Sequence, residues 1–255
     1  TFINTDINDT ITLNSVVSKY SVNYIVNFAA ESHVDNSISN SKPFIDTNIN
    51  GTHSLLSLLH THPIEKYLQV STDEVYGSLS DTSPPFTEDN PIAPNSPYSA
   101  SKASADLLCR SFYETYKYPI LITRCSNNYG PNQHSEKLIP LMIKNAKEGR
   151  KLPVYGNGKN IRDWIHVSDH CRAIGNVLHN GKEGQVYNIG GENELRNIDI
   201  VKKILTSLNL PFGQIEYVED RKGHDWRYAI DNTKIKSLMW KPLIDFKTGL
   251  NMILN

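Results

Sequence analysis

Short strand-like segments alternate with longer helical patterns in the first half of the chain, and this alternation restricts the possible folds more than any other feature. Residues 23–30 and 66–71 are apolar and rich in β-branched or aromatic side chains, as buried strands are. Apolar residues recur at helical spacing over 43–62, and a second helix over 98–116 leads to a further strand at 120–124. Strands joined by helices pair in parallel, so the pattern predicts an α/β fold with a Rossmann-like doubly wound parallel sheet.

The second half of the chain differs from the first in its proline and glycine content and in the length of its elements. Several prolines and a Gly-rich turn at 156–158 separate shorter elements there. We therefore expect two domains, which a chain of 255 residues is long enough to form. Residues 1–126 are expected to build the core domain, and residues 127–255 mostly a smaller, interleaved C-terminal domain, with some segments returning to the core sheet.

Charge and cysteine content narrow the classes of partner. The chain has 26 basic and 27 acidic residues, so it has no excess positive charge that would attract nucleic acid. We find no apolar stretch of about 18 residues that could span a membrane, and no signal peptide pattern. The three cysteines are too widely spaced for a zinc site or a disulfide framework. We expect a cytoplasmic protein that binds a small molecule, with no metal, nucleic acid or membrane partner.

A hydroxyl and two carboxyl groups directly follow the strand at 66–71. Thr72, Asp73 and Glu74 come at its carboxyl end, which is where ligands bind in open parallel sheets. Two neighbouring carboxyl groups at such an edge can serve as general acid and general base. The plain alternative is that Asp73 and Glu74 are solvated turn residues.

Tyr98 and Lys102 are placed four residues apart at the start of the second long helix, and therefore lie on one face of it. A nearby ammonium group favours the phenolate, which lets a tyrosine act as a base near neutral pH. Spacing alone is weak evidence, because it recurs at Tyr113 with Lys117 and at Tyr155 with Lys159. Tyr98 differs because only one loop separates it from the strand that leads to Thr72.

Together these motifs resemble the extended short-chain dehydrogenase/reductase superfamily, and within it the nucleotide-sugar 4,6-dehydratases, above all the dTDP-glucose 4,6-dehydratases. The likeness rests first on residues 71–77 and 98–102. It continues through nearly the whole chain in six further segments, at residues 29–35, 127–131, 136–140, 158–164, 187–191 and 223–225.

The resemblance implies an NAD-dependent lyase that converts dTDP-glucose to dTDP-4-dehydro-6-deoxy-glucose and water. Tyr98, held by Lys102, would remove the proton of the C4 hydroxyl while hydride passes from C4 to NAD, and Thr72 would hydrogen-bond the same oxygen. Glu74 would then take the C5 proton, and a protonated Asp73 would protonate the departing C6 hydroxyl. Hydride would return to C6 and Glu74 would return the proton to C5, so there is no net oxidation.

The resemblance also implies binding residues. The implied cofactor contacts are Asp6, Ile7, Ala29, Ala30, Glu31, Thr47, Tyr98, Lys102 and Asn128. The implied nucleotide-sugar contacts are Ser32, Thr72, Asn127, Lys137, Leu138, Pro153, Tyr155, Arg162, Asn197, Arg221 and His224. Arginines suit a diphosphate because guanidinium forks match phosphate oxygens. NAD is thereby expected at residues 1–126, the substrate mostly at 127–255, and a homodimer through helices 43–62 and 98–116.

One family feature is absent from the sequence. No Gly-rich G-x-G-x-x-G turn, which would present a helix N-terminus to the NAD pyrophosphate, occurs in it. We expect roughly the first fifty residues of the family pattern to be missing. This absence leaves open an inactive remnant or fragment that at most binds a nucleotide sugar. A UDP-glucose 4,6-dehydratase with the same chemistry also stays open, because nothing in the sequence distinguishes thymine from uracil.

Overall fold

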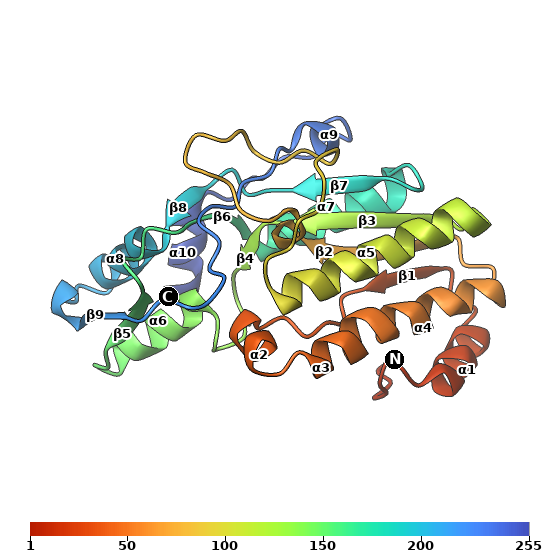
Figure 1. Cartoon of the computed structure of the whole chain (residues 1–255), viewed down its shortest axis with the longest axis horizontal. Helices are drawn as coiled ribbons and strands as arrows, with labels where there is room; N and C mark the ends of the chain where they lie inside the picture. The colour runs from red at the N-terminus through yellow and green to blue at the C-terminus, as the bar shows by residue number, and fades with distance from the viewer. Residues whose placement is uncertain (255) are drawn as a thin grey trace. The chain divides into compact units, whose positions relative to one another are not determined.

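The computed structural model describes residues 1–254, so Asn255, the last residue of the expected second domain, lies outside the described part (Figure 1). Two compact units are present, and each is assembled from three stretches of the chain. The first unit comprises Thr1–Gly77, Asn90–Arg124 and Gly175–Tyr187. The second comprises Ser78–Asp89, Cys125–Ile174 and the residues from Asn188 onward. The assignment of NAD to one domain and substrate to the other stays a prediction.

The first unit alternates helices and strands, as the sequence predicts. Its elements are α1 (Thr10–Tyr20), β1 (Tyr24–Asn27), α2 (Val34–Ser39), α3 (Lys42–Phe44), η1 (Ile45–Gly51), α4 (Thr52–Ser57), η2 (Leu58–His60), β2 (Lys66–Thr72), η3 (Asp73–Tyr76), α5 (Pro97–Tyr116) and β3 (Ile120–Cys125). Strands follow the order β1-β2-β3-β7, where β7 (Val186–Ile189) continues into the second unit. β1 and β2 pair in parallel, with Tyr24 opposite Lys66. The predicted α/β fold is confirmed.

The helix expected over 43–62 is present but is not uniform. Helical structure extends from Lys42 to His60, and its central segment, η1, is a π-helix. The hydroxyl of Thr52 donates to the carbonyl oxygen of Asn48 over 2.7 Å, while the Thr52 backbone N–H bonds to Ile49 instead. The Thr52 side chain thus bonds to the carbonyl oxygen that would accept from the Thr52 backbone N–H in an α-helix.

The long helix α5 begins one residue earlier than predicted, and its start is fixed by local contacts. Ser96 Oγ accepts from the backbone N–H of Ser99 over 3.1 Å, and Ser99 Oγ accepts from that of Ser96 over 3.0 Å. Pro97 occupies the first turn, where its missing N–H costs nothing. This capping box holds Tyr98 in a defined place at the helix start.

The core of the first unit lies between its helices and the sheet. β3 is buried along its whole length, as a strand covered on both faces must be. The buried side chains include Leu56, Tyr67, Cys109 and Ile120, each at most 1% exposed. The core thereby links the long helical run, β2, α5 and β3 into one body.

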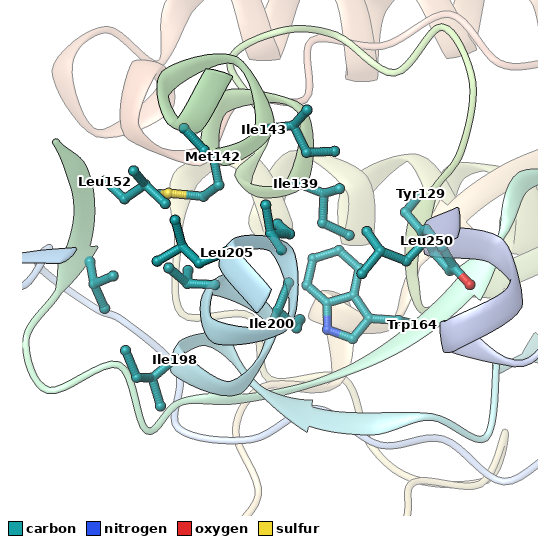
Figure 2. Close-up of a cluster of buried hydrophobic side chains, with 14 of the residues drawn as sticks. Tyr129, Ile139, Met142, Ile143, Leu152, Trp164, Ile198, Ile200, Leu205 and Leu250 are labelled. Carbon is teal, nitrogen blue, oxygen red and sulfur yellow. The ribbon is translucent and has the colours of Figure 1, made fainter. Parts of the chain in front are cut away.

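The second unit contains shorter elements. They are β4 (Asn127–Tyr129), α6 (Leu138–Lys147), β5 (Leu152–Tyr155), β6 (Ile161–His166), β8 (Glu194–Arg196), α8 (Asn197–Ser207), η4 (Phe212–Gln214), β9 (Ile215–Val218), α9 (Thr233–Lys236) and α10 (Phe246–Leu254), and α7 (Val167–Asn180) continues into the first unit. The strands form a β4-β6-β8 sheet and a β5-β9 pair. Figure 2 shows the core, which includes Ile139, Trp164, Leu205 and Leu250. None of the helices within residues 1–254 combines the length and apolar character needed to cross a membrane.

Candidate active site

The hydroxyl and carboxyl residues that follow β2 form a short, mostly buried turn. Thr72 ends β2 and caps η3, accepting the backbone N–H of Glu74 at Oγ1 over 3.3 Å. Its hydroxyl lies 3.4 Å from Oδ1 of Asp73 and donates to it. Asp73 is 2% exposed, whereas Glu74 is half-buried. A solvated turn would expose both carboxyl groups, so the plain alternative does not describe Asp73.

Lys102 is turned toward the strand that carries these groups. Its Nζ donates to the carbonyl oxygen of Val70 over 2.7 Å, two residues before Thr72. Tyr98 is buried with it, and its backbone N–H donates to Ser37 Oγ over 3.2 Å. The phenol and the ammonium therefore come from one face of a helix whose start is fixed, and that helix is attached to the carboxyl end of β2.

Asn48, which the sequence analysis missed, joins the start of α5 to the end of β1. Its amide nitrogen donates to Glu31 O over 3.0 Å and to Ser101 Oγ over 2.8 Å. Its Oδ1 accepts the backbone N–H of Glu31 over 2.9 Å. Ser101 in turn donates to the carbonyl oxygen of Tyr98 over 2.7 Å. The signal that could have identified Asn48 is a fully polar amide among the apolar positions of the 43–62 helix.

The segment after β1 is suited to line a dinucleotide-binding site. Ala29 is exposed and Ala30 half-buried, and neither carries a side chain beyond Cβ that would keep a flat ring away. Ala29 donates its backbone N–H to Asn27 Oδ1 over 3.0 Å, and Asn48 fixes Glu31. Three of the expected NAD contacts, Ala29, Glu31 and Tyr98, thus belong to one hydrogen-bonded frame centred on Asn48. These residues fit NAD.

The remaining expected cofactor contacts have other surroundings. Asp6 accepts the backbone N–H of Asn8 over 2.7 Å. Ile7 is half-buried, with its side chain packed against Gly51 and the core. Thr47 lies on η1, next to Asn48. Asn128, in the second unit, uses its amide there, accepting from His170 Nδ1 over 2.8 Å.

In the second unit, four expected substrate residues influence one another. The ring of Tyr155 lies edge-on to that of His224, with centroids 6.2 Å apart. Burial lowers the pKa of His224 to about 4, and the positive charges of Arg221 and Arg162 add to this shift. Nδ1 of the neutral ring donates to Asp220 Oδ1 over 2.6 Å. Two guanidinium groups near a neutral histidine and a tyrosine make a suitable setting for a phosphorylated ligand.

Arg162 is more deeply engaged than the sequence suggests. It is 4% exposed, and its guanidinium donates to the carbonyl oxygens of Ile161 and Asp225 over 2.7 and 2.9 Å. Its Cζ lies 4.2 Å from the ring centroid of Tyr228. Arg162 therefore also has a structural role in holding the segment around Asp225.

The other expected substrate residues are spread over several elements. Asn127 begins β4 and Asn197 begins α8, and the Oδ1 atoms of both are buried acceptors with no hydrogen-bond partner among residues 1–254. Lys137 caps α6, of which Leu138 is the first residue. Pro153 lies on β5, and Ser32 is exposed in the first unit. Buried acceptors of this kind call for a donor, such as a sugar hydroxyl.

Comparison with known proteins places these features in context. The sequence matches the family described as GDP-mannose 4,6 dehydratase over residues 1–253. The low-salt glycan biosynthesis protein Agl12 of Haloferax volcanii is 53% identical over 249 residues, which cover 98% of this chain and 79% of that protein. The dTDP-glucose 4,6-dehydratase of Xanthomonas campestris is 47% identical over 268 residues, covering 98% of this chain and 76% of its own length.

A solved structure of a dTDP-glucose 4,6-dehydratase is also similar to this chain. The dTDP-glucose 4,6-dehydratase DesIV of Streptomyces venezuelae, crystallised with NAD bound, has a TM-score of 0.95 and 46% sequence identity to this chain. The match covers 98% of this chain and 76% of that one. Family, relatives and fold agree with the resemblance that the sequence motifs carry, and this chain belongs to the GDP-mannose 4,6-dehydratase family.

Proposed function

We propose that the protein is an NAD-dependent dehydratase that converts dTDP-glucose to dTDP-4-dehydro-6-deoxy-glucose and water. The observation that carries this proposal is the bond from Lys102 to Val70, because it joins the Tyr98 helix to the strand that ends at Thr72, directly before Asp73 and Glu74. Two relatives named for this reaction, from Xanthomonas campestris and Streptomyces venezuelae, support the choice of substrate.

The first group of residues acts on the C4 hydroxyl. Tyr98 takes its proton as phenolate, and the Lys102 ammonium stabilises that form. The Thr72 hydroxyl hydrogen-bonds the same oxygen and fixes its orientation. NAD, when bound along Ala29, Ala30 and Glu31, supplies a reversible hydride acceptor.

The second group eliminates water from C5 and C6. A 4-ketone acidifies the C5 proton, and Glu74, which is half-buried and close to solvent, is the base that removes it. Asp73 gives a proton to the departing C6 hydroxyl. Its 2% exposure suits that task, because a carboxyl group shielded from water is easier to keep protonated. Two adjacent carboxyl groups with different exposure thus divide the acid and base roles.

The nucleotide end of the substrate is assigned to the second unit. Arg221 and Arg162 would neutralise the diphosphate, and neutral His224 keeps Nε2 available as an acceptor. Asn127 and Asn197 offer buried acceptors to hydroxyl groups. Residues 1–126 are accordingly assigned to NAD and residues 127–255 mostly to the nucleotide sugar.

A homodimer and a cytoplasmic location belong to the same proposal. α4 and α5 pack together, and α5 leaves Leu107 about half exposed on its outer side, next to the partly buried Leu108. A second copy packing on this face would cover Leu107. Light scattering of the purified chain tests the dimer, and Leu107→Asp should yield a monomer. The cytoplasm is the compartment in which NAD and nucleotide sugars are available.

The decisive experiment incubates the purified chain with dTDP-glucose and NAD and follows the absorbance that 4-keto-6-deoxy sugars develop in alkali. UDP-glucose and GDP-mannose are run in parallel. Product from dTDP-glucose alone supports the proposal. Product from UDP-glucose instead would mean that the substrate carries a different base, and product from GDP-mannose that it carries a different base and a different sugar. A folded chain that makes no product from any of them would support the inactive remnant or fragment.

A further inference from the structure

A buried ion pair lies behind the catalytic turn of the first unit. Arg124 Nε donates to Asp106 Oδ2 over 2.9 Å, and the two side chains are 8% and 2% exposed. Burial lowers the pKa of Arg124, but Asp106 and Tyr76 raise it by more, so the guanidinium stays charged. Buried ion pairs seldom add to stability, because desolvation offsets the attraction between the charges. The pair is therefore better explained by the contacts that it makes.

Arg124 also contacts the segment that carries both carboxyl groups. Its Cζ lies 4.7 Å from the ring centroid of Tyr76, a residue that is 2% exposed. Tyr76 is the last residue of η3, the short helix that begins at Asp73. A guanidinium face against a buried ring is a strong, directional contact. The end of η3 is thereby attached to the end of β3.

Asp106 completes the link on the helix side. It lies one turn after Lys102 on α5, so both side chains occupy the same face. The pKa of the Cys109 thiol, raised mainly by burial, is raised further by Asp106 and lowered by Lys102, so both charges act at one place. Asp106 Oδ1 has no hydrogen-bond partner in the described part of the chain. Arg124 is thus the main group that balances the buried negative charge of Asp106, which lies next to Lys102.

We propose that Arg124 and Asp106 are positioning residues for the dehydration: Asp106 anchors Arg124, and Arg124 holds Tyr76 and with it the Asp73–Tyr76 helix against α5. The inference rests on the function proposed above. Asp73 and Glu74 lie on η3, whereas Lys102 is held independently by Val70. Loss of the pair should therefore impair the elimination, which uses the η3 carboxyl groups, more than the oxidation, which uses Tyr98 and Lys102.

The test uses the double variant Arg124→Met/Asp106→Leu, which removes the pair without leaving a buried charge and should therefore fold. Single-turnover measurements with dTDP-glucose follow the absorbance of reduced nicotinamide and the formation of product. We expect elimination to slow about a hundredfold, the effect of a misplacement near 1 Å, so that reduced nicotinamide accumulates. Arg227→Met/Glu194→Gln, which removes an ion pair of the second unit, is the matched control.

A second readout does not depend on activity. The N–H of Gly77 bonds to Glu74 O over 3.3 Å, and that of Ala93 bonds to Val75 O over 2.9 Å. Hydrogen exchange at these two amides reports on η3, and we expect it to accelerate in the Arg124→Met/Asp106→Leu variant but not in the control. Wild-type exchange together with wild-type kinetics, or equal slowing of oxidation and elimination, would overturn the inference. If the wild-type chain turns over no nucleotide sugar, the proposed function fails, and exchange alone decides the positioning role.

Discussion

Lys102 donates from Nζ to the carbonyl oxygen of Val70 over 2.7 Å, which holds an ammonium group of α5 at the strand that ends in Thr72. Lys117 has the same spacing from a tyrosine, but its side chain is 67% exposed and is paired with Glu114. The two lysines therefore offer a direct comparison of one sequence pattern in two environments.

Lys102→Met should reduce turnover by roughly a hundredfold or more, because Tyr98 loses the cation that favours its phenolate. The remaining activity should increase with pH, since higher pH favours the Tyr98 phenolate in the absence of the ammonium group. Rates over a pH series, with Lys117→Met beside them, check this. Equal effects of the two substitutions would remove the special role of Lys102.

Asp73→Asn and Glu74→Gln should each lower product formation by about 10²- to 10⁴-fold, the usual contribution of a general acid or base. Both substitutions keep the size of the side chain, so far-ultraviolet circular dichroism should not change. Glu183→Gln, at an exposed position, is the control for removal of a carboxylate. Full activity in either catalytic variant would contradict the assigned roles.

Asn48→Ala should weaken NAD binding by roughly ten- to a hundredfold. The substitution removes the partner of both backbone groups of Glu31 and of Ser101, and an unsatisfied buried polar group costs about 1–3 kcal/mol. Titration of the purified chain with NAD, followed by fluorescence quenching, measures the change. Asn50→Ala, at an exposed position of the same π-helix, should bind NAD as the wild type does.

Stability should fall in mild acid because of His170. Burial lowers its pKa from 6.5 to about 4, so between these values the unfolded chain binds a proton that the folded chain does not. The free energy of unfolding is unaffected by this group above pH 6.5 and decreases as the pH falls toward 4, by roughly 3 kcal/mol in total. Urea unfolding at about pH 7 and about pH 4.5 should show less acid loss in His170→Gln than in the wild type. His134→Gln, an exposed position, should show the wild-type dependence.

The regular elements of the first unit were predictable because their signals are local. The strand at 66–71 and the helix at 98–116 agree with β2 and α5 within one residue at each end. The apolar pattern gives the type of element, and Ser96, Pro97 and Ser99 give the start of the helix. Such signals need no knowledge of the rest of the chain.

The polar frame of the site could not be predicted in the same way. Asn48 is separated from Glu31 by 17 residues and from Ser101 by 53, and no local pattern links them. The sequence places Lys102 near Tyr98 but does not indicate Val70 as its acceptor. Arg162 was expected at a diphosphate, and its bonds to backbone carbonyl oxygens in the second unit depend on a loop that folds back from residue 225. Tertiary contacts decide these details.

The π-helix over Ile45–Gly51 also makes the length of this segment critical. A π-helical turn holds more residues than an α-helical one, so deletion of a single residue there would let the segment relax to an α-helix. The buried leucines of α4 would keep their positions, whereas the amide of residue 48 would rotate away from Glu31 and Ser101. A chain lacking Ile49 is therefore expected to unfold cooperatively, as the parent does, yet to lose NAD in an equilibrium titration. Retained NAD binding would show that the extra residue has no part in the site.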